Sequence, residues 1–158
     1  MQTTSLSELK KELSIMPKDI LVDVCTKLIR FKKENKELLH YLLFESNNEQ
    51  GFINNLKLEV DMMFEEVNTQ TVYWAKKTIR KILRWINRYC KYSGLATTYI
   101  ELLSHFCVRM KSLPLDWSES KVLLNIYESQ VKKINKYILT LHEDLQFDFR
   151  LKRESLNF

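Results

Sequence analysis

Glycine and proline are scarce in this chain: 158 residues include two of each. Typical usage of about 7% and 5% would give about eleven glycines and eight prolines. Tight turns and β-hairpins depend on these two residues, so their scarcity excludes a hairpin-rich fold and predicts an all-α protein. The four breakers, Pro17, Gly51, Gly94 and Pro114, lie between apolar periodic stretches or at their edges, where helices are expected to end.

Long apolar runs are also missing. The longest uncharged apolar stretch, 38–44, is far shorter than the roughly 20 residues that a membrane span requires. The first residues lack the basic segment followed by an apolar run that marks a signal peptide. A cytoplasmic protein is therefore expected.

Catalytic and metal-binding signatures are absent from the sequence. The three cysteines, Cys25, Cys90 and Cys107, form an odd set without CxxC spacing and are expected to be reduced and buried. One E-x-x-H pair, Glu37 with His40, stands without the second pair and the further carboxylates that a di-iron bundle needs. Because no glycine-rich phosphate loop and no activated nucleophile is recognisable, we expect no enzyme activity, no metal and no cofactor.

Apolar residues recur at spacings of three and four along most of the chain, which predicts about seven helices. The expected ranges are 5–14, 17–31, 38–45, 52–67, 71–92, 98–113 and 116–145. A bend is expected between the second and third of these, and a loop over 46–51. Gly94 is expected to close the fifth helix.

Three capping boxes mark expected helix starts: Ser5 with Glu8, Thr98 with Glu101, and Asp116 with Glu119. Short connections favour antiparallel neighbours, so the helices are expected to form a compact bundle or a short α-α superhelix. A single domain over 1–158 is expected. Its end, 146–158, alternates apolar and polar residues and suits an extended tail as well as a frayed helix.

The most informative segment is the helix expected at 71–92, which contains basic residues and no acidic residue. Its seven cations are Lys76, Lys77, Arg80, Lys81, Arg84, Arg88 and Lys91. On a helical projection its apolar residues form one arc toward the core and the cations form the opposite arc. Trp74, Trp85 and Tyr92 lie at the border between them.

Two interpretations of this basic helix remain open. Residues 71–113 hold nine cations and one anion, whereas the preceding helix carries Glu59, Asp61, Glu65 and Glu66. Antiparallel pairing of the two helices could neutralise part of the charge, in which case the feature is architectural. Otherwise the cations form a surface for a partner.

The stretch LKKELSIMPKDILVDVCTKLIRFKKENKELLHYLLFES resembles the opening of small uncharacterised bacterial α-helical proteins. In these proteins a short LKK-type helix is followed by a Pro or Ser, a Lys-acid pair and a second amphipathic helix. The resemblance covers about a quarter of the chain. It implies a bacterial, cytoplasmic, all-α protein whose helical hairpins could stack as in armadillo or HEAT-like folds, and it carries over no functional residue.

The sequence therefore favours a non-enzymatic interaction or scaffold module with an acidic protein partner. The alternative is a nucleic-acid-binding protein that uses the basic-aromatic helix, with cations on phosphates and aromatic side chains on unpaired bases. Leu58 and Met62 form a second apolar stripe on the 52–67 helix, which predicts a helix contacted from two directions or a homodimer interface. Membrane binding is not expected, because the apolar arc of 71–92 is needed for the core.

Overall fold

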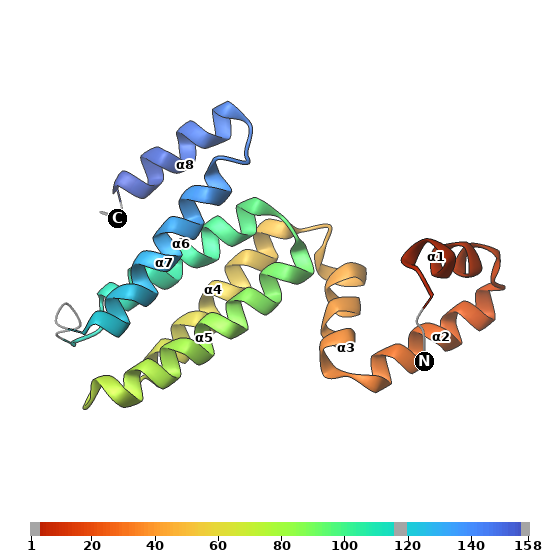
Figure 1. Cartoon of the computed structure of the whole chain (residues 1–158), viewed down its shortest axis with the longest axis horizontal. Helices are drawn as coiled ribbons and strands as arrows, with labels where there is room; N and C mark the ends of the chain where they lie inside the picture. Colours follow the sequence, from red (N-terminus) through yellow and green to blue (C-terminus); the bar gives the residue numbers. More distant parts are fainter. Residues whose placement is uncertain (1–3, 116–119, 156–158) are drawn as a thin grey trace. The chain divides into compact units, whose positions relative to one another are not determined.

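The computed structural model describes residues 4–115 and 120–155, with side chains as far as residue 151. All regular structure in these ranges is helical, which confirms the all-α prediction. Where the sequence predicts one domain, the chain divides into two compact units, 1–44 and 45–158 (Figure 1). No helix in the described ranges is both long and apolar enough to cross a membrane.

The smaller unit begins with the predicted capping box. Its helices are α1 (Leu6–Ile15), α2 (Lys18–Phe31) and α3 (Lys33–His40), and the π-helical segment η1 (Tyr41–Glu45) leads out of it. Ser5 Oγ accepts a bond from the Glu8 amide, and the Glu8 carboxylate accepts one from the Ser5 amide at 2.9 Å. Lys32 is extended with φ −143°, which ends α2 and confirms the predicted bend.

Helices α1, α2 and α3 have no buried side chain. Leu6 of α1 is 83% exposed and Phe31 of α2 is 77% exposed. Cys25, expected to be buried, is accordingly half-buried, because these helices enclose too little volume to cover it.

The described residues of the larger unit form five helices, and α6 packs against three of the others. These helices are α4 (Glu49–Glu65), α5 (Val72–Ser93), α6 (Ala96–Lys111), α7 (Lys121–Ile138) and α8 (Glu143–Ser155). Helix α6 packs against α4, α5 and α7, while α8 packs against α7 (Figure 1). The residues of α6 that face the core are completely covered. Leu102 and Phe106 have no exposed surface, and the Phe106 ring centroid lies 5.5 Å from that of Phe64 in α4.

The corner between α5 and α6 fixes the direction of both helices. Gly94 has φ +71°, a conformation that costs glycine little, and its amide donates to the Cys90 carbonyl. Thr98 Oγ1 and Ser93 Oγ both donate to the Glu49 carboxylate, which ties the start of α4 to this corner. The predicted Thr98 and Glu101 capping box is therefore wrong: α6 begins earlier, at Ala96, and Thr98 is fully buried inside it.

The start of α4 also differs from the prediction of a loop over 46–51. The helix begins at Glu49, because the Asn48 side chain accepts a bond from the Gly51 amide at 3.0 Å and caps the first turn. On the outer side of α4, Leu58 and Met62 are 62% and 55% exposed, so the described helices leave this second stripe uncovered.

The long helix predicted at 116–145 is in fact two helices, α7 and α8, separated at 139–142. The predicted capping pair, Asp116 with Glu119, lies outside the described residues, and Ser120 caps α7 instead. Thr140 Oγ1 donates to the Tyr137 carbonyl at 2.7 Å and takes up a backbone acceptor where α7 ends. Of the two arrangements expected for 146–158, an extended tail or a frayed helix, the described part is helical as far as Ser155.

Candidate functional site

The candidate site lies on α5, a 22-residue helix with well-defined ends. Thr71 is extended and its side-chain oxygen accepts a bond from the Trp74 amide at 3.4 Å, which caps the first turn. Gly94 in the left-handed conformation ends the helix. The 71–92 prediction is thus confirmed to within one residue at each end.

One face of α5 is fully committed to the core. The residues without exposed surface on this face are Ala75, Ile79, Ile82, Ile86 and Cys90. Their spacings of four and three place them on one stripe, which packs against α4 and α6. Burying each large side chain of this stripe stabilises the fold by about 1.5–3 kcal/mol, so α5 is held rigidly with its opposite face outward.

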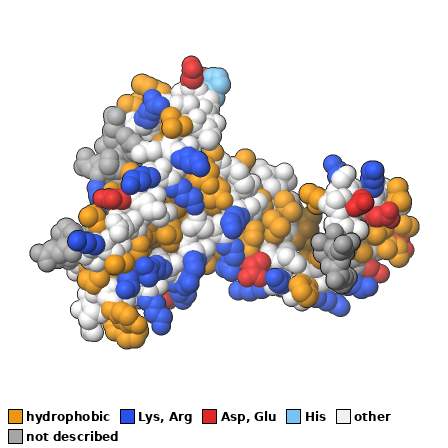
Figure 2. Space-filling view, viewed as in Figure 1, with side chains coloured by type: hydrophobic (Ala, Val, Ile, Leu, Met, Phe, Trp, Pro, Cys, Tyr) orange, Lys and Arg blue, Asp and Glu red, His pale blue; other side chains and the backbone are white. Residues whose placement is uncertain are grey.

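The opposite face is defined by seven cations, and we call it the basic face. It consists of Lys76, Lys77, Arg80, Lys81, Arg84, Arg88 and Lys91. Lys76 and Arg88 are half-buried and the other five are exposed. Figure 2 shows basic side chains gathered over α5 in the larger unit.

The acidic helix before α5 does not neutralise the basic face. Glu59, Glu65 and Glu66 are exposed, and none of them pairs with a cation among the described side chains. Asp61 does have partners, but on α6: its Oδ1 lies 2.7 Å from His105 Nε2 and pairs with Arg109 Nε at 3.1 Å.

A second charged residue of α4 also pairs with α6. Lys57 pairs with Glu101. Asp61 and Lys57 are thus both engaged at the α4–α6 contact and not with the basic face. Six of the seven basic-face cations, Arg88 aside, have no carboxylate partner within the part of the chain that the structure describes.

Aromatic side chains accompany the cations at the start of α5. Tyr73 is 63% exposed and Trp74 is 49% exposed, with ring centroids 5.3 Å apart in an edge-on arrangement. The Lys76 and Lys77 ammonium groups lie 5.4 and 5.6 Å from the Tyr73 and Trp74 ring centroids respectively. Each exposed ring is thus paired with a lysine one turn further along.

The other two border aromatics are partly covered. Trp85 packs on Tyr89 with ring centroids 4.4 Å apart, and Tyr92 meets the other side of Tyr89 at 5.3 Å. Tyr89 in turn faces Phe52 of α4 at 6.4 Å. Tyr92 therefore belongs to an aromatic cluster between α5 and α4, whereas Trp85 also borders open space.

That open space is a surface hollow of about 370 Å³, which we call the Trp85 hollow. It is lined by Met63, Lys81, Arg84, Trp85 and Arg88. Sequence analysis missed Met63, because its place beside α5 follows from packing of α4 and not from any local pattern.

The structure also extends the positive charge onto α7. Lys133 donates to Asn87 of α5, and its ammonium lies 5.2 Å from the Tyr99 ring. Burial lowers the pKa of Lys133, and the nearby Lys91 lowers it further. Lys133 is 46 residues from Asn87 along the chain, so no sequence signal could have associated the two.

The groups that sequence analysis considered for catalysis are separated. Burial raises the pKa of the Cys90 and Cys107 thiols to about 12, which keeps both protonated at neutral pH. His105 is engaged by Asp61, whereas His40 and His142 are exposed. Among the described residues, no three His, Cys, Asp or Glu side chains come together as a metal site would need.

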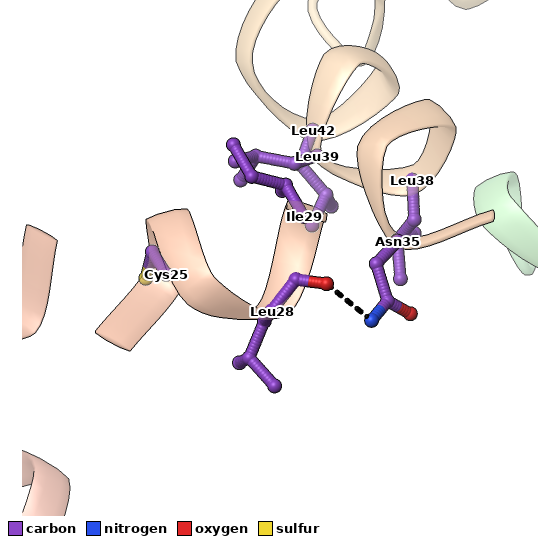
Figure 3. Close-up of a pocket in the computed structure, with 7 residues that line it drawn as sticks. All are labelled: Cys25, Leu28, Ile29, Asn35, Leu38, Leu39 and Leu42. Atoms are coloured by element: carbon purple, nitrogen blue, oxygen red, sulfur yellow. Dashed lines mark hydrogen bonds between the residues drawn. The ribbon is translucent and has the colours of Figure 1, made fainter. Parts of the chain in front are cut away.

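A second recess lies within the smaller unit, between α2 and α3. It encloses about 240 Å³ and is lined by Cys25, Leu28, Ile29, Asn35, Leu38, Leu39 and Leu42 (Figure 3). Its one polar side chain, the Asn35 amide, donates to the Leu28 carbonyl at 2.7 Å. The lining holds no charged side chain, so the recess is mainly apolar, and the free thiol of Cys25 lies at its wall.

Comparison of the chain with protein-family models, with curated proteins and with solved structures finds no significant match.

Proposed function

We propose that the chain is a non-enzymatic interaction module that binds a polyanionic partner through the basic face of α5. One observation carries this proposal: six of the seven cations lack a carboxylate partner among the described residues, although an acidic helix packs beside them. A surface of uncompensated cations attracts polyanions and speeds their encounter.

The rigidity of α5 supports the same proposal. Its core stripe is covered completely and both ends are capped, so the cations are presented from a fixed scaffold. Lys77, Lys81 and Arg84 are separated by four and three residues, about one helical turn each. Regularly spaced cations on a rigid support suit an extended anionic partner better than a single small anion.

An acidic protein surface and a nucleic acid are both extended and negatively charged, so both could bind the basic face. The exposed Tyr73 and Trp74 rings at the start of α5 favour nucleic acid as the second candidate, because aromatic side chains stack on unpaired bases. The inaccessible Cys90 and Cys107 thiols support a role without catalysis.

A titration of fluorescent polyglutamate and of a fluorescent oligonucleotide, at about 50 and 200 mM salt, tests the proposal. The variant is the triple substitution Arg80→Ala, Arg84→Ala and Arg88→Ala. If the oligonucleotide contacts these residues, removal of three cations should weaken its binding by tenfold or more. The slope of the logarithm of the binding constant against the logarithm of the salt concentration should become shallower by about 2.

The matched control removes three exposed cations from the smaller unit: Lys10→Ala, Lys11→Ala and Lys27→Ala. It has the same change in net charge and should bind within about twofold of the unmodified chain, because a contact requires position as well as charge. Absence of binding to both probes, or equal weakening by the two triple variants, would refute the proposal.

A further inference from the structure

The Trp85 hollow is a surface depression beside α5. Met63 contributes from α4, while Lys81, Arg84, Trp85 and Arg88 contribute from two successive turns of α5. Its volume of about 370 Å³ lies in the range of small-ligand sites.

The wall of the hollow combines positive charge with apolar surface. Lys81 and Arg84 are exposed and have no carboxylate partner among the described side chains. The Arg88 guanidinium, also in the lining, lies 5.4 Å from the Tyr89 ring centroid. Met63 and Trp85 supply a soft thioether and a flat indole.

The indole of Trp85 is fixed before any ligand arrives. Its contact with Tyr89, with ring centroids 4.4 Å apart, supports one side of the ring system, and Tyr89 is supported in turn by Phe52 of α4. Because the ring is already ordered, stacking of a ligand on it costs little further side-chain entropy.

We infer that the Trp85 hollow is a base-binding site for single-stranded nucleic acid. One unpaired base lies against Trp85 and Met63, and the adjoining phosphates contact Lys81 and Arg84. The strand continues along the basic face of α5. This inference rests on the proposed function, and it identifies the polyanion.

Both parts of the lining favour this ligand over the alternatives. An acidic peptide would satisfy the cations, but its Asp and Glu side chains supply no flat aromatic group beside each negative charge. A duplex presents phosphates but keeps its bases stacked and paired. A single strand presents phosphates and free base faces together, and sequence-tolerant stacking on aromatic side chains is its usual mode of recognition. The exposed Trp74 at the start of α5 offers a further stacking surface on the same helix.

The experiment compares three fluorescent probes of matched charge on the full chain: an oligothymidylate, an abasic oligomer with the same number of phosphates, and polyglutamate. Oligothymidylate should bind about tenfold more tightly than the abasic oligomer, since one stacked base contributes about that factor. This comparison uses the unmodified chain and does not depend on any variant being folded.

Two variants then assign the base to Trp85. Trp85→Met should weaken oligothymidylate binding about tenfold and leave binding of the abasic oligomer unchanged, whereas Trp85→Phe, which keeps an aromatic face, should retain most of the affinity. Far-UV circular dichroism and the urea midpoint confirm that both variants are folded.

The outcomes separate this inference from the proposed function. Equal affinity for oligothymidylate and the abasic oligomer, or equal weakening of both by Trp85→Met, overturns the base site and leaves a polyanion-binding face. Tighter binding of polyglutamate overturns it in favour of an acidic protein partner. If none of the three probes binds, the inference and the proposed function both fail.

Discussion

The buried corner that joins α4, α5 and α6 can be tested by Thr98→Val. This substitution keeps the side-chain shape and removes the hydroxyl that donates to the Glu49 carboxylate. Thr98 has no exposed surface, so water cannot take the place of the lost donor without a rearrangement. The Glu49 carboxylate then has one donor fewer, although Ser93 Oγ still donates to it at 2.6 Å.

The expected loss follows from the charge of the acceptor. Hydrogen bonds to charged groups contribute about 1.5–3 kcal/mol, so we expect Thr98→Val to lower the free energy of unfolding by about 2 kcal/mol. With a urea m-value of about 2 kcal/mol per molar, the unfolding midpoint falls by about 1 M. This is a substantial fraction of the 5–15 kcal/mol that typical domains have.

Tryptophan fluorescence during urea unfolding is the appropriate assay, because Trp74 and Trp85 both belong to the larger unit. Thr97→Val is the matched control: Thr97 precedes Thr98 on α6, is half-buried, and makes no side-chain hydrogen bond among the described residues. Thr97→Val should change the free energy of unfolding by less than about 0.5 kcal/mol. A Thr98→Val variant as stable as this control would refute the role assigned to the corner.

Two further predictions concern the charges and thiols of the chain. Asp61→Ala should destabilise the larger unit by about 1 kcal/mol, since the half-buried Asp61 carboxylate engages two side chains of α6, whereas Glu59→Ala should have no measurable effect in the same urea titration. In a thiol-titration assay at pH 8, Cys25 should react quickly and Cys90 and Cys107 only on unfolding, because a pKa of about 12 leaves about one thiol in ten thousand ionised; three equal rates would contradict the burial.

Local sequence patterns predicted the features that depend on neighbouring residues. The Ser5 capping box and the start of α5 rest on side chains three residues from the backbone amides that they satisfy, and α5 ends at the left-handed backbone of Gly94. The Thr98 pattern looks the same along the chain, yet its hydroxyl is taken by Glu49, which is 49 residues away. A capping motif covers only four consecutive residues, so it cannot show that a distant residue binds the same hydroxyl.

The same distinction applies at the end of the chain. Apolar spacing continues across 139–142, so periodicity alone predicts one helix, whereas the Thr140 hydroxyl takes up a backbone acceptor at the end of α7. The alternation of Phe147, Phe149 and Leu151 suits a strand-like tail. It also places Phe147 and Leu151 one turn apart, and the chain adopts that helical arrangement as α8.

The sequence by itself determined that α5 forms, which face of it is buried and which face is positive, because the order of residues along a helix of 3.6 residues per turn fixes those directions. It could not determine whether Glu59, Asp61, Glu65 and Glu66 neutralise that charge, since this depends on how α4 is rotated against its neighbours. The tertiary structure decided the question: Asp61 is turned toward α6, the other three acids point to solvent, and the packing of Met63 beside Trp85 creates the hollow. Helix rotation is set by the shape of the core, which no local pattern encodes.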